Sequence, residues 1–125
     1  MSSRVLVVDD EPQFGRLFAT VLTELGYEVS SATGGGQGLA MIRERPPDIL
    51  FLDIKMPAMD GLECLRRIKK LKRKFVIVVM TGFGDIKSAR EAMRLGADEY
   101  ISKPFDIDDL KRLVNEIMGA PVGSR

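Results

Sequence analysis

The chain has 125 residues, 45% of them hydrophobic, and its 19 basic and 18 acidic side chains give a formal net charge of +1. This length is enough for one domain with a substantial core, and the balanced charge excludes an overall field that would draw the protein to nucleic acid or to an anionic membrane. The single cysteine, Cys64, excludes an internal disulfide; it lies in a helical apolar pattern with no histidine to activate it, so we expect a packed, unreactive thiol. The sequence has neither a signal-peptide pattern nor a segment long and apolar enough to span a membrane, which predicts a cytoplasmic protein without membrane attachment.

The first part of the chain alternates apolar runs with helical patterns. The run Val5–Val8 predicts a buried strand that ends in the acidic segment 9–11. Apolar residues then recur at helical spacing from Phe14 to Leu25, and Gly26 closes this helix. A weaker and more polar strand is expected over Tyr27–Ala32.

The glycine-rich segment Thr33–Gly38 predicts a flexible loop before a short helix over Leu39–Glu44, which the pair Pro46-Pro47 stops. A phosphate-binding loop is the alternative interpretation. The segment lacks the Gly-Lys-Ser/Thr ending of a Walker loop and the spacing of a dinucleotide fingerprint. We therefore interpret it as a plain loop.

Asp53 ends the most uniformly apolar run of the chain. The run Ile49–Leu52 has no polar alternation, which is typical of a strand buried on both faces of a parallel sheet. Met56-Pro57 prevents a helix from starting directly behind it, so Asp53 is expected at the carboxyl end of a strand, facing a loop. Taken alone, such a residue is an ordinary strand-ending or capping aspartate.

A third helix is predicted to begin at the capping-box-like segment Asp60–Glu63, with Leu62, Leu65 and Ile68 on its buried face. Seven of the nine residues from Arg66 to Lys74 are basic. They form either a docking patch for an acidic partner or nucleic acid, or a solvated helix end with cations favourably placed at the C-terminus. We favour the solvated helix end.

The last part of the chain predicts a buried strand over Phe75–Met80 and a short strand over Glu99–Ser102. The helix between them, stopped by Gly96, has only a thin apolar stripe and should therefore be weakly anchored. The members of this stripe are Ile86, Ala89 and Met93.

The final helix is expected to follow the strand break at Lys103-Pro104, with Asp106 as its cap. We expect one domain over residues 1–118 and a flexible C-terminal tail over 119–125. The apolar face of the final helix consists of Ile107, Leu110, Val114 and Ile117.

Five alternations of strand and helix predict an α/β fold, a parallel sheet covered by helices on both faces. The first, third and fourth strands are continuously apolar and should be central, whereas the second and fifth are more polar and should lie at the edges. This matches a flavodoxin-like three-layer sandwich with five helices and the strand order 2-1-3-4-5. In that fold ligands bind at the carboxyl ends of the first and third strands, where Asp9, Asp10 and Asp53 are found.

These three carboxylates would repel one another, and a hard divalent cation such as Mg²⁺ is the simplest relief. The next two strand ends add the hydroxyl of Thr81 and the ammonium of Lys103. Such a set stabilises a transferring phosphoryl group and can leave it on Asp53 as an acyl phosphate. Each member has a simpler explanation, since Lys103 could merely neutralise the acids and the other residues could cap helices. Their joint occurrence at four strand ends favours the phosphoryl site.

The chain resembles a response-regulator receiver domain over Arg4 to Met118. The resemblance is carried by Val-Val-Asp9-Asp10, by Asp53 with Met56-Pro57 and Met59-Asp60-Gly61, by Met80-Thr81-Gly82 and by Lys103-Pro104-Phe105. Further segments are similar to receivers of the sporulation phosphorelay and of enhancer-binding transcription activators. They are Thr81–Asp85, Ala92–Gly96 and Lys103–Asp106.

The resemblance implies that Asp53 accepts a phosphoryl group from the histidine of a sensor kinase or phosphotransfer protein. It implies Mg²⁺ ligation by Asp10, Asp53 and the backbone carbonyl of Lys55, with Asp9 acting through water. Lys103 would contact the phosphoryl oxygens, and its bond to Pro104 is expected to be cis. The side chain of Lys55 is expected to influence the lifetime of the phosphoryl group.

The same resemblance implies a switch in which Thr81 moves toward the phosphoryl group and Tyr100 turns inward. The surface that changes is expected to be the fourth helix, fifth strand and fifth helix, which would bind a downstream protein or a second copy of the chain. Apart from catalysing its own phosphorylation and dephosphorylation the domain is not expected to be an enzyme, and no DNA-reading motif is found. The charged side chains of this surface either contact the partner or form a merely solvated face, and we favour the contact; they are Lys87, Arg90, Arg94, Asp98, Asp108 and Lys111.

Two other classes share part of this pattern. A phosphatase of the haloacid dehalogenase type has similar aspartate, threonine and lysine chemistry, but it requires Asp-x-Asp on the first strand, whereas Asp9 and Asp10 are adjacent and Asp53 follows the third. A small flavodoxin has the same sheet order, but the acidic segment 9–11 would repel its phosphate. Both are therefore disfavoured.

Overall fold

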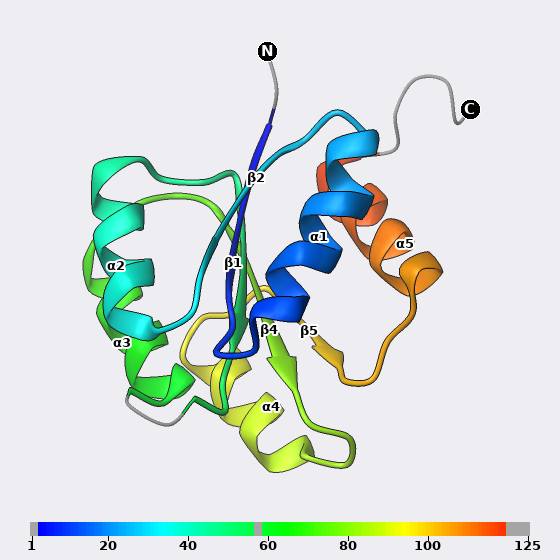
Figure 1. The fold of residues 1–125 in the computed structure, drawn as a ribbon. Helices are drawn as coiled ribbons and strands as arrows, with labels where there is room; N and C mark the ends of the chain where they lie inside the picture. Colours follow the sequence, from blue (N-terminus) through cyan, green and yellow to red (C-terminus); the bar gives the residue numbers. More distant parts are fainter. Residues whose placement is uncertain (1–2, 57–58, 120–125) are drawn as a thin grey trace.

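The computed structural model describes residues 3–56 and 59–119, which form a parallel five-stranded sheet in the order β2-β1-β3-β4-β5 (Figure 1). The predicted strand order is confirmed. Three continuously apolar strands lie at the centre because both of their faces are covered, and the two polar strands form the edges. The strands are β1 (Arg4–Val8), β2 (Glu28–Ala32), β3 (Ile49–Asp53), β4 (Val76–Thr81) and β5 (Glu99–Ser102).

Within residues 3–56 and 59–119, five helices cover the sheet. Figure 1 shows α1 and α5 together on one face and α2 and α3 on the other, with α4 beside β4 and β5. Each face has its own apolar core, one built around Phe18 and Phe51 and the other around Leu50 and Leu65. The helices are α1 (Pro12–Glu24), α2 (Gly35–Glu44), α3 (Gly61–Lys70), α4 (Ile86–Arg94) and α5 (Ile107–Met118).

The start of α2 differs from the prediction. The helix begins at Gly35, so most of the glycine-rich segment expected as a loop is its first turn. A Cβ atom at Gly38 would lie 2.8 Å from Val8 Cγ2, and one at Gly35 would lie 2.9 Å from Met59 Sδ. These glycines therefore let α2 pack closely on the sheet and on the loop before α3, a requirement that local propensity does not reveal.

The buried face of α4 also differs from the prediction. Ile86 and Met93, two of the three residues expected inside, are 59% and 38% exposed, and the buried residues are Ala89 and Ala92. Two methyl groups bury little apolar area, so the apolar contribution that fixes this helix to the sheet is small. The buried apolar stripe is thin, as expected, although two of its residues were wrongly predicted.

Several local predictions are confirmed. Asp60 caps α3 through the N–H of Glu63, Asp106 forms a capping box with Asp109, and the bond from Lys103 to Pro104 is cis. Cys64 is fully buried, and burial raises the pKa of its thiol to about 11.

Pro57 and residues 120–125, which belong to two of the predictions, lie outside the described residues. Among the described residues, no helix combines the length and apolar character needed to cross a membrane.

Candidate functional site

Three carboxylates meet at the carboxyl ends of β1 and β3. These strands are paired in parallel, with Val8 opposite Leu52, so the residues that follow them emerge side by side. One oxygen from each of Asp9, Asp10 and Asp53 lies within 4.8 Å of the others. Asp9 and Asp53 are only 2% and 5% exposed, whereas Asp10 is half-buried. The cluster expected from the sequence is thus present in the fold.

Local turns orient the two buried carboxylates. The backbone N–H of Lys55 donates to Asp53 Oδ1 at 2.9 Å, and that of Glu11 donates to Asp9 Oδ1 at the same distance. Each aspartate therefore bonds to the backbone two residues later, as in an Asx turn. Asp9 and Asp10 do not cap α1, whose first turn has no side-chain cap, so the simpler explanation for this pair is wrong.

Close packing at the start of α3 supports the Asp53 turn. A Cβ atom at Gly61 would lie 2.4 Å from the carbonyl oxygen of Asp53 and 2.2 Å from the Cα of Ile54. The N–H of Gly61 donates to the carbonyl of Ile54 at 3.2 Å. A residue without a side chain is therefore required where α3 abuts the end of β3.

Lys103, which follows β5, directs its ammonium into the carboxylate cluster. Its Nζ lies 2.6 Å from Asp9 Oδ2, 3.3 Å from Asp53 Oδ2 and 3.7 Å from Glu11 Oε1. The ammonium also lies 4.0 Å from the centre of the Phe14 ring, a distance typical of a cation–π contact. Sequence reasoning missed Glu11 and Phe14 as members of the site, although Glu11 adjoins the acidic pair and Phe14 begins the buried stripe of α1.

The electrostatic balance of the site is negative. Burial, reinforced by the charge of Asp9, raises the pKa of Asp53 to about 6 against the opposing effects of the Lys55 N–H and the Lys103 ammonium. Burial alone would lower the pKa of Lys103, but its hydrogen bond to Asp9 and the charges of Asp53 and Asp9 raise it overall. Lys103 therefore stays protonated while the carboxylates lack full compensation.

The donor set fits a hard divalent cation. Its closely grouped oxygen atoms belong to carboxylates, and burial together with the neighbouring charge of Asp9 raises the pKa of one of them, Asp53. Mg²⁺ prefers carboxylate oxygens and retains several waters, which suits a cluster whose third member, Asp10, is half-buried. The residues present are therefore compatible with the ion that the sequence predicts.

Thr81 and Tyr100 line one cavity of about 420 Å³ at the carboxyl end of β4 and beside β5. Thr81, the last residue of β4, is 2% exposed, with its hydroxyl 3.5 Å from that of Ser102. Tyr100 on β5 is 45% exposed. Thr81 does not cap α4, because Asp85 does so through the N–H of Ser88. The capping explanation for Thr81 is therefore wrong.

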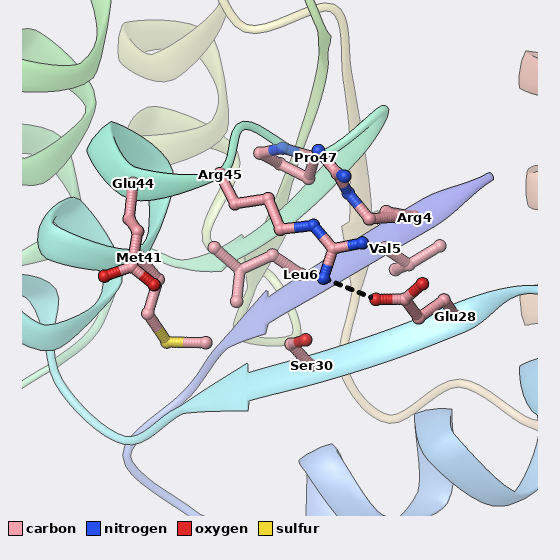
Figure 2. Close-up of a pocket in the computed structure, with 9 residues that line it drawn as sticks. All are labelled: Arg4, Val5, Leu6, Glu28, Ser30, Met41, Glu44, Arg45 and Pro47. Carbon is pink, nitrogen blue, oxygen red and sulfur yellow. Dashed lines mark ion pairs between the residues drawn. The ribbon is translucent and has the colours of Figure 1, made fainter. Parts of the chain in front are cut away.

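A separate cavity of about 170 Å³ lies at the amino ends of β1 and β2, far along the strands from the carboxylates. Figure 2 shows its apolar floor at Leu6 and Met41, with the Arg45 side chain reaching across to Glu28 at 3.1 Å. Arg4 at its rim donates to the carbonyl of Pro46. Arg45 and Glu28 are thus paired with each other, and the cavity shares no residue with the acidic site.

Comparison with known proteins gives consistent matches. The family described as "Response regulator receiver domain" matches residues 5–115. Sporulation initiation phosphotransferase F of Bacillus subtilis is 34% identical over 118 residues, covering 94% of this chain and 95% of that protein. Regulatory protein AtoC of Escherichia coli is 34% identical over 116 residues, which is 93% of this chain but only 25% of AtoC. The crystal structure of the receiver domain of NtrX from Brucella abortus superimposes with a TM-score of 0.85 at 36% identity, covering 94% of this chain and 99% of that one.

Proposed function

Because this chain belongs to the response regulator receiver domain family, we propose that Asp53 is the residue that accepts the phosphoryl group. Receiver domains act in two-component signalling, where the donor is the phosphohistidine of a sensor kinase or a phosphotransfer protein. The observation that carries the assignment is the position of Asp53, a buried carboxylate grouped with Asp9 and Asp10 and 3.3 Å from the Lys103 ammonium.

In the proposed transfer, one carboxylate oxygen of Asp53 attacks phosphorus as the phosphorus–nitrogen bond of the donor breaks. The electron pair of that bond stays on the imidazole nitrogen of the donor. With a pKa of about 6, Asp53 is largely ionised at neutral pH and therefore available as the nucleophile. Lys103 neutralises charge beside Asp53 Oδ2 and is in reach of oxygens on a group attached there. The domain in this proposal catalyses only its own phosphorylation and dephosphorylation.

The proposed ligands of Mg²⁺ are Asp10, Asp53 and the backbone carbonyl of Lys55, with Asp9 acting through water. When bound, the ion offsets negative charge on the phosphoryl oxygens during transfer. The turn at Lys55 holds the Asp53 carboxylate in place through its N–H. Asp9 keeps Lys103 within the site through their contact of 2.6 Å.

The proposed output surface consists of α4, β5 and α5. Thr81 and Tyr100 line the same cavity, so movement of the Thr81 hydroxyl toward Asp53 would free volume that the Tyr100 ring can enter. The weakly anchored α4 lies against this cavity through Ala89 and presents the exposed Ile86 and Met93. This mixture of apolar and charged side chains suits a downstream protein or a second copy of the chain, rather than nucleic acid.

Phosphorylation by acetyl phosphate in the presence of Mg²⁺ tests the assignment of Asp53. Intact-mass analysis should show one added phosphoryl group on the wild type and none on Asp53→Asn. Asp48→Asn is the matched control, because Asp48 directly precedes the amino end of the same strand and its amide oxygen could still accept from the Arg4 N–H. Equal labelling of the wild type and Asp53→Asn would overturn the assignment.

A further inference from the structure

The side chain of Lys55 connects the Asp53 turn to the start of α4. Its Nζ lies 3.5 Å from Asp85 Oδ2, across the gap between the loop after β3 and the loop after β4. The Lys55 side chain is 69% exposed, whereas that of Asp85 is 20% exposed. The ammonium is therefore turned toward α4 while the main chain of the same residue holds Asp53.

The two carboxylate oxygens of Asp85 have different environments. Oδ1 accepts from the Ser88 N–H at 3.2 Å and caps α4. Oδ2 is buried and, within the part of the chain that the structure describes, has no hydrogen-bond partner. A buried anionic oxygen without a donor is unfavourable, so the Lys55 ammonium supplies compensation that the cap alone does not give.

We propose that Asp85 is a positioning residue of the phosphorylation site, holding the Lys55 ammonium at α4 until a phosphoryl group on Asp53 draws it away. The inference rests on the proposed function of Asp53. It adds a second connection from the site to α4, besides that of Thr81 and Tyr100.

The change in charge at Asp53 supplies the driving force. Phosphorylation replaces a carboxylate of charge −1 by a group with a charge approaching −2. The Lys103 ammonium already contacts both Asp9 and Asp53, so it cannot fully offset the added charge. Lys55 has a flexible four-carbon stem that begins two residues from Asp53, so it can reach the added oxygens. An ion pair whose lysine is largely exposed is weak. A new anion at Asp53 is therefore enough to draw the Lys55 ammonium away from Asp85.

Release of Lys55 has a consequence for α4. The buried residues of this helix are the small Ala89 and Ala92, and the Lys55–Asp85 pair adds an electrostatic contact at its N-terminus. When the ammonium leaves, Asp85 Oδ2 loses its compensation, and the first turn of α4 is free to adjust. The apolar residues exposed on α4 would then be presented differently to a partner.

The test is a double-mutant cycle on Lys55 and Asp85, since a cycle isolates the interaction of two residues. Asp85→Asn keeps an N-cap but removes the charge, and Asp85→Ser is a second variant that keeps a cap. Lys55→Met keeps the length of the side chain without its ammonium. Glu91→Gln is the matched control, because it breaks an exposed pair with Arg94, 3.1 Å apart, on the same helix.

Labelling by acetyl phosphate should be about two- to fivefold faster in Asp85→Asn than in the wild type, the range allowed by one exposed ion pair. Asp85→Asn introduced into Lys55→Met should not change the labelling rate of that variant. Glu91→Gln should not change the labelling rate of either the wild type or Lys55→Met. In the unphosphorylated Asp85→Asn variant, the amide signals of Lys55 and Ser88 should move part of the way toward their positions in beryllofluoride-treated wild type.

Equal acceleration by Asp85→Asn in both backgrounds would overturn the positioning role while leaving Asp53 as the acceptor. Amide signals of Lys55 and Ser88 that do not move in Asp85→Asn would overturn it as well. An unlabelled wild type would instead refute the proposed function. Circular dichroism of each variant separates these results from a loss of folding.

Discussion

The ammonium of Lys103 makes its shortest carboxylate contact, 2.6 Å, with Asp9, a residue 94 positions earlier in the chain. Asp53 Oδ2 is 3.3 Å away. Lys103 is therefore part of a largely buried ion-pair network, in addition to its proposed role in phosphoryl transfer. Both interpretations of Lys103 that the sequence allows are compatible with this geometry.

Replacement of Lys103 by methionine should destabilise the metal-free protein by about 3–5 kcal/mol at pH 8, because Asp9 and Asp53 are left buried without their cation. Mg²⁺ should restore part of the loss by offsetting the same charges. Urea unfolding with and without Mg²⁺ measures both effects, and Lys103→Arg is the control that retains the charge. A loss below about 1 kcal/mol would contradict the network.

The Asp53→Asn variant should be more stable than the wild type at neutral pH in metal-free buffer. The pKa of Asp53 is about 6 in the folded chain, against an ordinary value of 3.8. Well below pH 3.8 the carboxyl is protonated in both states and costs nothing. Between pH 4 and 6 the folded chain binds more protons than the unfolded chain, so the stability of the wild type falls as the pH rises.

The advantage of Asp53→Asn should therefore grow from near zero at about pH 3 to as much as about 3 kcal/mol at pH 7. Urea unfolding across this pH range measures it, and added Mg²⁺ should reduce the difference. If the difference in the free energy of unfolding between the variant and the wild type stayed constant from pH 4 to pH 7, the ionised form of Asp53 would not be destabilised by its surroundings.

Asp10→Ala should stabilise the metal-free protein by about 1 kcal/mol, the scale of repulsion between charges a few ångströms apart near water. It should also abolish most of the rise in melting temperature caused by Mg²⁺. Thermal melts with and without Mg²⁺ test both expectations, and Glu44→Gln at the exposed end of α2 is the control. If the Mg²⁺ response survived in Asp10→Ala, this residue would not be a ligand.

Beryllofluoride, which mimics the phosphoryl group, should shift backbone amide signals across α4, β5 and α5. The reason is the cavity that Thr81 and Tyr100 share, which connects the end of β4 with the outer surface. Thr81→Ala should confine the shifts to the loops around Asp10 and Asp53. The proposed switch is wrong if wild-type shifts are already confined to those loops and leave residues 90–111 unaffected.

Gly61→Ala should destabilise the protein by about 2–3 kcal/mol and slow the labelling of Asp53. The added Cβ would collide with backbone atoms of Asp53 and Ile54 at 2.4 and 2.2 Å, which cannot rotate out of the way. Gly36→Ala is the matched control, because a Cβ there has no neighbour within 4 Å and should stabilise α2 by about 0.5–1 kcal/mol. Equal effects of the two substitutions in urea unfolding would contradict this account.

Most of the fold was predictable because its signals are local. The apolar runs that end at Val8, Leu52 and Met80 specify buried central strands, since only strands covered on both faces dispense with polar alternation. Parallel strands bring their carboxyl ends to one edge, so Asp9, Asp10 and Asp53 could be grouped from the sequence alone. The same reasoning identified Lys103 and Thr81 as neighbours of that edge.

Tertiary packing decided what depends on contacts between distant segments. The early start of α2 follows from the close approach of Gly38 to Val8, and the orientation of α4 from the fit of Ala89 and Ala92. The sequence by itself determined which chemical groups are present and at which strand ends they emerge, because strand and helix signals act over a few residues. Only the tertiary structure decided which of these groups pair, such as Lys55 with Asp85, because a long side chain selects its partner by distance and burial.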